Sequence, residues 1–67
     1  MQISARNQLK GTVKSVKHGS VMSEVVVDVG GQEVVAAITR SSAESLGLVQ
    51  GDQVTAIIKA TEVMLGK

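Results

Sequence analysis

The chain has no cysteine and only one histidine, His18. Disulfide bonds are therefore excluded, and a structural metal site built on cysteine and histidine is nearly excluded with them. A chain without cysteine also fits a reducing compartment, and the N-terminus lacks the apolar segment of a signal peptide. These absences together predict a cytoplasmic protein.

Aromatic residues are also absent, and seven Lys and Arg against six Asp and Glu leave a formal net charge of only +1. Domains that bind single-stranded nucleic acid stack bases on aromatic side chains and follow the backbone with a basic groove. Because this chain has neither feature, nucleic-acid binding is disfavoured. The longest apolar runs fall far short of the roughly 20 residues that cross a bilayer, so no membrane segment is expected.

Catalytic arrangements are missing from the sequence as well. There is no Cys nucleophile, no His-x-x-x-His spacing and no paired carboxylates, and His18 lies in an expected turn without an obvious acid–base partner. The sequence Gly30-Gly31 is followed by Gln-Glu-Val rather than by a helix, which argues against a phosphate-cradling loop. We therefore expect a protein that is not an enzyme.

The apolar content consists of small aliphatic side chains, with 43% of the 67 residues hydrophobic. A chain of this length forms at most one domain, here taken as residues 1–67, and its core barely stabilises it. Ordering costs on the order of 1.5 kcal/mol per residue, so burial and entropy nearly cancel in such small domains. With disulfides and metal set aside, self-association is the remaining source of stability.

The pattern of apolar residues predicts a mainly β fold. The dipeptide Gly30-Gly31 can take the positive φ angles of a tight two-residue turn, which joins the second and third strands of a meander. Apolar residues at both parities of these two strands indicate that both faces of the sheet are partly buried. The strands are expected over residues 9–16, 21–29, 32–39, 53–60 and, as a short fifth strand, 62–65.

A short helix is expected between the third and fourth strands. The sequence Ser41-Ser42-Ala43-Glu44 has the pattern of a capping box, in which Ser41 and Glu44 satisfy each other's backbone amides. Gly47 stands where a left-handed residue commonly ends a helix. The resulting order, β-β-β-α-β-β, is that of an OB-like five-stranded small barrel with one short helix.

Three segments of the chain together closely resemble the Mop domain, the molybdate-binding module of molbindins: Ser4-Ala5-Arg6-Asn7-Gln8, Thr39-Arg40-Ser41-Ser42 and Ile58-Lys59-Ala60-Thr61. The resemblance covers essentially the whole chain. It implies an OB-like fold and a homohexamer assembled as a trimer of dimers. It also implies non-catalytic binding of molybdate or tungstate at subunit interfaces for intracellular storage or homeostasis, with no organic cofactor and no side chain bonded directly to a metal.

The resemblance also implies which residues hold the oxyanion. The main site would lie at the dimer interface, with Ser4, Arg6 and Lys59 as side-chain ligands, backbone amides of Ala5 and Ala60, and Thr39 and Ser42 from the facing subunit. A second oxyanion site would lie near the threefold axis. The turn residues His18, Gly19 and Ser20 are the candidates for it.

The chemistry of an oxyanion agrees with these segments. A doubly charged, fully deprotonated tetrahedral anion offers only acceptors, so its pocket needs donors and no carboxylate, and none of the proposed ligands is Asp or Glu. Phosphate still carries a proton at neutral pH, and leaving that proton unpaired costs roughly 1–3 kcal/mol. Sulfate is also an acceptor-only dianion, so its rejection must depend on the size of the site.

Plainer explanations exist for each of these residues. Arg6 and Lys59 taken singly are ordinary solvated charges, Ser42 is equally explained by helix capping, and His18 by a surface turn. The alternative function is an OB-type nucleic-acid-binding module or a ligand-sensing regulatory module that recruits a partner.

Overall fold

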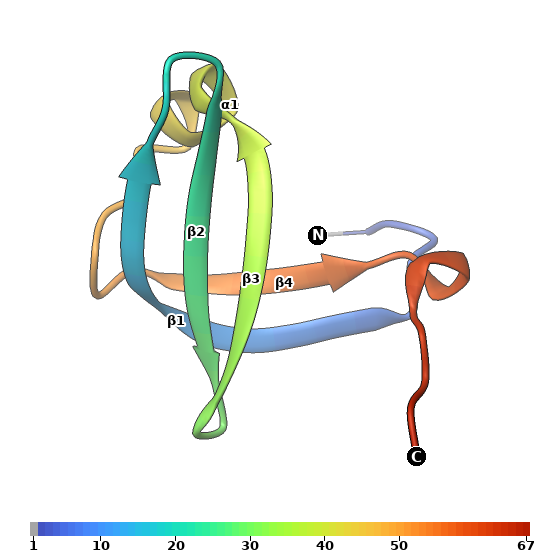
Figure 1. Cartoon of the computed structure of the whole chain (residues 1–67). Helices are drawn as coiled ribbons and strands as arrows, with labels where there is room; N and C mark the ends of the chain where they lie inside the picture. The colour runs from blue at the N-terminus through green and yellow to red at the C-terminus, as the bar shows by residue number, and fades with distance from the viewer. Residues whose placement is uncertain (1) are drawn as a thin grey trace.

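The computed structural model describes residues 2–67, which form one antiparallel sheet of four strands with two short helical segments (Figure 1). The order of strands in the sheet is β3-β2-β1-β4. The strands are β1 (Asn7–His18), β2 (Met22–Val29), β3 (Gln32–Thr39) and β4 (Gln53–Ile58), and the helices are α1 (Arg40–Ser45) and the 3₁₀ helix η1 (Ala60–Glu62).

The long strand β1 serves two different parts of the sheet. Its first half, from Asn7 to Thr12, pairs with β4, and its second half, from Thr12 to His18, pairs with β2. The register shifts between Val13 and Ser15, and such a bulge bends and twists a strand. Figure 1 shows the result: β1 curves from the three-stranded meander into a two-stranded ribbon with β4. We call this ribbon, residues 7–12 with β4, the arm.

The bulge also directs Lys14 toward the edge strand. Its ammonium forms an ion pair and hydrogen bond with Glu33 of β3. This hydrogen bond and the charge of Glu33 raise the pKa of Lys14. Both side chains are exposed, so the pair orients the edge of the meander but adds little to stability.

Gly11 is required by the curvature of β1. A Cβ atom at this position would lie 2.6 Å from the carbonyl oxygen of Asp28 and 2.7 Å from Cγ1 of Val27. Both distances are too short for a Cβ atom. Strand β1 can therefore pass this close to the end of β2 only because residue 11 is a glycine.

We expect Gly11→Ala to lower the free energy of unfolding by about 1–3 kcal/mol, the usual cost of forcing an extra methyl group into packed surroundings. Urea denaturation would measure the change. Gly66→Ala is the matched control, because a Cβ atom at Gly66 meets nothing within 4 Å. Equal stability of the two variants would show that β1 can relax away from Asp28.

The core is small and built from valines. Val13, Val25 and Val27 are buried in one cluster, and Ala43 of α1 is buried with 1% of its surface exposed. Val25 and Val27 share one face of β2, as the alternation predicts, while Val26 on the other face is only partly buried. The partly buried residues around the cluster are Val16, Val29, Ala36, Ile38, Leu48 and Val54.

The isolated chain is more open than a compact protein of its mass. Its accessible surface is 5348 Å², whereas about 4,000 Å² is typical of a folded monomer of this size. Its radius of gyration is 12.2 Å, against about 11 Å for a compact chain of this length. The chain therefore exposes surface that an ordinary small domain buries.

Several predictions from the pattern are confirmed. Residues 32–39 form a strand with the predicted bounds, and the first three strands form an antiparallel meander. Gly30 and Gly31 have φ angles of 58° and 85°, as a tight hairpin turn requires. Gly47, with a φ of 61°, follows α1 as the predicted left-handed residue.

The prediction of a fifth strand at residues 62–65 is wrong for the single chain. After Lys59 the backbone turns into η1, closed by hydrogen bonds from Glu62 N to the Lys59 carbonyl (2.9 Å) and from Val63 N to that of Ala60 (3.4 Å). Residues 63–67 have no regular structure. Without a fifth strand, the sheet of the described residues stays open instead of closing into a barrel.

Candidate functional site

The end of the arm gathers the residues of the predicted main site that lie at the two ends of the sequence. Arg6 directly precedes β1 and Lys59 directly follows β4, and the pairing of Asn7 with Ile58 places these two residues next to each other. The amide Nδ2 of Asn7 donates to the Ile58 carbonyl at 3.1 Å. The pairing of β1 with β4 therefore determines the backbone positions of Arg6 and Lys59.

The segment before β1 is held by a second hydrogen bond. Nε2 of Gln8 donates to the Ala5 carbonyl at 2.7 Å, and Ala5 is partly buried while Ser4 is exposed. After β4, Lys59 is the N-cap of η1 and Ala60 is its first residue, and both are exposed. The structure therefore places five of the seven predicted ligands of the main site at the same end of the arm: Ser4, Ala5 and Arg6 just before β1, and Lys59 and Ala60 just after β4.

The charges at the end of the arm are available to a ligand. Within residues 2–67 the ion pairs are Lys14–Glu33 and Arg40–Glu44, so neither Arg6 nor Lys59 is paired with a carboxylate. Two exposed cations side by side repel each other weakly in water. A bound anion would remove this repulsion and gain charge-assisted hydrogen bonds from both.

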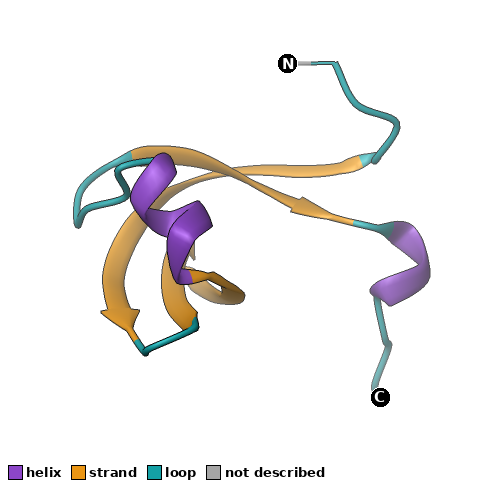
Figure 2. Ribbon diagram, turned by 90° about the horizontal axis from the view of Figure 1, so that it is seen from above, coloured by secondary structure: helices purple, strands orange, loops and turns teal. Residues whose placement is uncertain are grey.

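The other two predicted ligands, Thr39 and Ser42, lie at the start of α1. Figures 1 and 2 both show α1 above the meander and η1 at the far end of the arm. One chain thus does not bring Thr39 and Ser42 to Arg6 and Lys59.

Thr39 is the N-cap of α1, which corrects the predicted capping box at Ser41. The hydroxyl of Thr39 accepts a hydrogen bond from Ser42 N at 3.1 Å and donates to Ser42 Oγ at 2.7 Å. Glu44 instead faces Arg40, with Oε2 3.7 Å from Nε. The helix starts earlier than predicted because the hydroxyl at the end of β3 already satisfies the first free amide.

We expect Thr39→Val to lower the free energy of unfolding by about 1 kcal/mol, because the isosteric side chain cannot cap α1. Thr39→Ser keeps the hydroxyl and should stay close to the parent chain. Thermal or urea unfolding of both variants would measure the difference. If valine and serine at this position gave the same stability, the hydroxyl would have no structural role.

Of the three candidates for the second site, only Gly19 and Ser20 lie in the turn between β1 and β2. His18 is the last residue of β1, paired with Ser23 of β2, which corrects its predicted place in the turn. Nδ1 of His18 is 2.7 Å from Oγ of Ser23, a buried residue with 2% of its surface exposed. Gly19 N donates to the Met22 carbonyl at 2.7 Å, and Ser20 is exposed. The histidine thus has a structural partner that the sequence did not reveal.

This turn lies beside the start of α1, and Arg40 joins the two. Arg40 N donates to the Val21 carbonyl at 2.8 Å, and its Nη1 donates to the Gly19 carbonyl at 3.4 Å. Sequence reasoning did not assign a role to Arg40. The sequence did contain a signal for such a role. Arg40 stands between the hydroxyl residues Thr39 and Ser41, so a cation and hydroxyl donors are neighbours in the chain.

None of the predicted ligands lines any of three surface cavities formed by residues 2–67. The larger cavities, of about 490 and 430 Å³, are lined mainly by aliphatic side chains of β3, β4 and the segment after α1. Residues 2–67 also contain no group of three or more His, Asp or Glu side chains that could hold a metal ion.

The open curled sheet and its two exposed groups of cationic and hydroxyl donors define the class: a small, mainly β domain whose donors suit an anionic ligand. The chain belongs to the TOBE domain family, whose model matches residues 3–65. Among curated proteins it is 52% identical to molybdenum-pterin-binding protein 3 of Clostridium pasteurianum over 66 residues, 97% of each chain.

Solved structures give the same result. A molybdate-binding protein from Sporomusa ovata matches with a TM-score of 0.95 and 52% identity over 100% of both chains. ModG, a cytoplasmic molybdate-binding protein solved with molybdate bound, matches with a TM-score of 0.86 and 48% identity, over 90% of this chain and 43% of its own. The resemblance to the Mop domain is therefore confirmed.

The length of the helices bears on membrane insertion. Within residues 2–67, no helix is long and apolar enough to cross a bilayer.

Proposed function

We propose that this chain binds molybdate, and also tungstate, without catalysing a reaction, and that it serves cytoplasmic storage or homeostasis of the oxyanion. The observation that carries the proposal is the placement of Arg6 beside Lys59 at the end of the arm, without a carboxylate partner in residues 2–67. The similarity over the full length to a molybdate-binding protein supports the choice of ligand.

The ligand groups of one chain match the chemistry of the anion. Arg6 and Lys59 supply charge-assisted hydrogen bonds, Ser4 a hydroxyl, and Ala5 and Ala60 backbone amides. All of these groups donate, and a fully deprotonated tetrahedral dianion only accepts. The site holds the intact oxyanion through hydrogen bonds, so no side chain is bonded to the metal and no organic cofactor is needed.

A second copy of the chain completes the main site in this proposal. Helix α1, which Thr39 caps and which contains Ser42, lies far from the end of the arm in its own chain (Figures 1 and 2), so these two residues reach the anion from a facing subunit. The accessible surface exceeds that of a compact monomer by about 1,300 Å², more than the roughly 800 Å² that each partner buries in a stable interface. A homohexamer built as a trimer of dimers would bury this exposed surface between its subunits.

We also propose a second oxyanion site at His18 and the turn residues Gly19 and Ser20. Its support is the position of the turn beside the start of α1, where the guanidinium of Arg40 contacts the Gly19 carbonyl. Around a threefold axis, three copies of this turn and of Arg40 would surround one anion with donors.

Calorimetric titration with molybdate in a buffer containing excess sulfate and phosphate tests the proposed function. Saturable binding is expected, with a stoichiometry other than one anion per chain because sites are shared between subunits. The absence of heat at two temperatures would overturn the proposal and favour the nucleic-acid or regulatory alternative. Nucleic-acid binding would show itself by steep weakening with added salt.

A further inference from the structure

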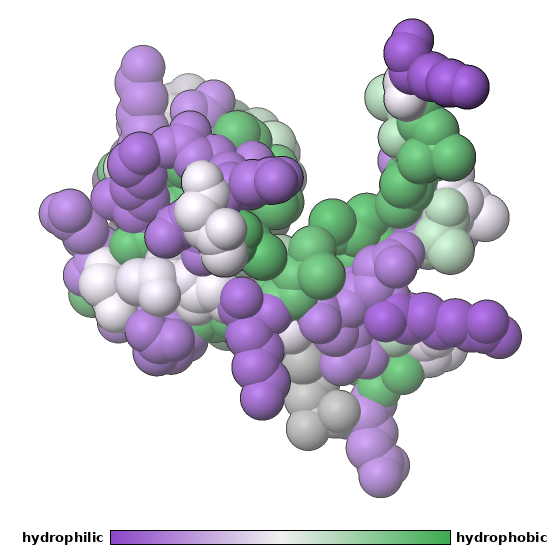
Figure 3. Space-filling view, turned by 90° about the horizontal axis from the view of Figure 1, so that it is seen from below, coloured by the Kyte–Doolittle hydropathy of each residue, from purple (hydrophilic) through white to green (hydrophobic). Residues whose placement is uncertain are grey.

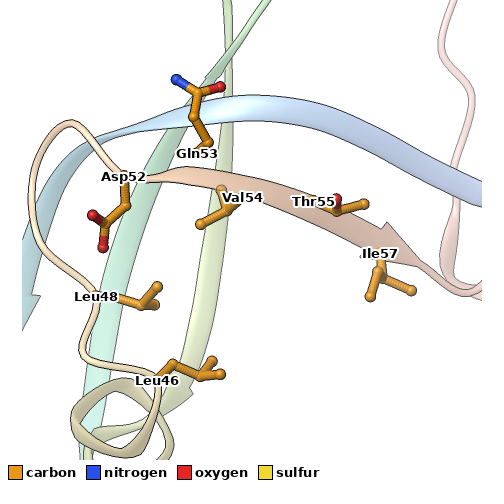
Figure 4. Close-up of a pocket in the computed structure, with 7 residues that line it drawn as sticks. All are labelled: Leu46, Leu48, Asp52, Gln53, Val54, Thr55 and Ile57. Atoms are coloured by element: carbon orange, nitrogen blue, oxygen red, sulfur yellow. The ribbon is translucent and has the colours of Figure 1, made fainter. Parts of the chain in front are cut away.

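The inner face of the open sheet, which carries the valine core, has one polar exception. Figure 3 shows hydrophobic surface on the meander and along the arm. Figure 4 shows four of the aliphatic side chains that line a cavity between β4 and the segment after α1: Leu46, Leu48, Val54 and Ile57. Among residues 2–67 the buried polar side chain is Ser23, with 2% of its surface exposed. It shares a face of β2 with Val25 and Val27, where the alternation of the strand predicts an apolar residue.

Ser23 lies in the row of paired residues at which β1 ends. It pairs with His18 of β1 on one side and with Ile38 of β3 on the other, and residues paired across strands share a face of the sheet. The side chain of Ile38 has no hydrogen-bonding atom, whereas Nδ1 of His18 is 2.7 Å from Oγ of Ser23. Within residues 2–67 the buried hydroxyl therefore depends on His18 for its hydrogen bond.

The burial of this hydroxyl determines which ring nitrogen carries the proton. Buried donors almost always find an acceptor, whereas an oxygen lone pair is more often left unused. The hydroxyl of Ser23 therefore donates to Nδ1 of His18, and a neutral ring then carries its proton on Nε2. His18 is exposed, and no group within residues 2–67 is bonded to Nε2. The Nε2–H group is thus free to donate to a ligand.

The charged groups around the imidazole ring suit a ligand that only accepts hydrogen bonds. On β1 and β2 they are Lys17 and Glu24, which pair with each other in the row next to the ring and therefore lie on the opposite face of the sheet. On α1 they are Arg40 and Glu44, whose carboxylate lies 3.7 Å from Nε of Arg40. Nη1 of Arg40 also donates to the Gly19 carbonyl, next to the ring, at 3.4 Å.

We propose that Ser23 is a positioning residue, which holds the ring of His18 so that Nε2–H donates to an oxyanion at the second site. The inference rests on the proposed function and assigns a role to a residue outside the ligand set. A ring with a fixed orientation and a fixed tautomer loses little freedom when the anion binds, so less of the binding energy is spent on ordering it. This explains why a core-facing position of β2 carries a hydroxyl.

Nuclear magnetic resonance tests the tautomer without any anion. His18 is the one histidine of the chain, so a sample labelled with ¹⁵N-histidine reports a single ring. At an alkaline pH we expect Nδ1 to show the chemical shift of an unprotonated nitrogen and Nε2 that of a protonated one. In Ser23→Ala the ring should exchange between tautomers, which moves the two shifts toward each other.

Ser15→Ala is the matched control, because Ser15 is an exposed serine of β1. It should leave both ring shifts as they are in the parent chain. A proton on Nδ1 in the parent chain would overturn the proposal. Ring shifts in Ser23→Ala equal to those of the parent chain would also overturn it, since the hydroxyl would then have no effect on the ring.

The same ring signals follow the anion at the second site separately from the main site. Molybdate should shift Nε2 of the parent chain saturably. Ser23→Ala should need about two to ten times more molybdate for half of this shift, the effect of weakening one neutral hydrogen bond. Heat of binding without any shift of Nε2 would overturn the ligand role of His18 and leave the main site standing. Absence of both would overturn the proposed function as well.

A double-variant comparison separates positioning from a general effect on the fold. The backbone amide signals of Gly19 and Ser20 report binding in chains that lack the histidine. His18→Ala should weaken the second site, and adding Ser23→Ala should cause no further loss, because the hydroxyl acts through the ring. A further loss as large as that of Ser23→Ala alone would show that Ser23 acts independently of His18, and this result would overturn the proposal.

Discussion

Molybdate affinity is expected to fall at least tenfold in Arg6→Ala, and at least tenfold in Lys59→Ala, while the oligomer stays intact. Each substitution removes a hydrogen bond from a charged donor, worth about 1.5–3 kcal/mol, and about 1.4 kcal/mol corresponds to a factor of ten in affinity. Titration calorimetry measures the affinity, and sedimentation measures the assembly.

Lys10→Ala is the matched control for these two variants. Lys10 lies in the same arm, paired with Thr55 of β4, and is exposed, but it is not at the end where Arg6 and Lys59 meet. Its removal should change the affinity less than twofold, through long-range charge alone. Unchanged titration curves for Arg6→Ala and Lys59→Ala would show that the main site is assigned wrongly.

Val13→Ala is expected to lower the free energy of unfolding by about 2–3 kcal/mol, from the loss of two buried carbon atoms and the cavity left behind. Val13 is only 1% exposed and lies where β1 curves between its two partners. A lone domain of this size holds roughly 3–5 kcal/mol in total, so most of its stability would be lost.

Urea denaturation at fixed protein concentration measures this effect, because stability depends on concentration in an oligomer. Val21→Ala is the control, since Val21 is 70% exposed and surface substitutions usually change stability by less than about 0.5 kcal/mol. If Val13→Ala were no less stable than Val21→Ala, the stability would reside mainly in the contacts between subunits.

The sequence predicts best those elements that depend on the conformational preferences of a few neighbouring residues. The glycines at positions 30 and 31 determine a hairpin turn by their own φ preferences, so the meander followed from the sequence. The start of α1 was misplaced because three hydroxyl residues, Thr39, Ser41 and Ser42, compete for the cap. Spacing alone does not say which of them lies at the end of β3.

The tail and the site depend on distant contacts, which the sequence does not encode locally. Residues 62–65 look like a strand, but a strand needs a partner edge, and no edge of the same chain lies beside them. The family resemblance grouped Thr39 with Arg6 and Lys59, whereas the fold of one chain separates them. In the proposed main site they would meet only through symmetry between copies, which no periodicity in the sequence reveals.

The two halves of β1, which pair with different strands, are expected to differ in how readily they unfold locally. The meander joins neighbours in the sequence, while the arm closes a loop of some forty to fifty residues between β1 and β4, a step with a larger entropic cost. The buried residues of the described chain, Val13, Ser23, Val25, Val27 and Ala43, all lie outside the arm. Among the four strands, hydrogen exchange should therefore be fastest along the arm. An anion at the proposed main site would thus bind at the least rigid part of the sheet and would restrain that part most.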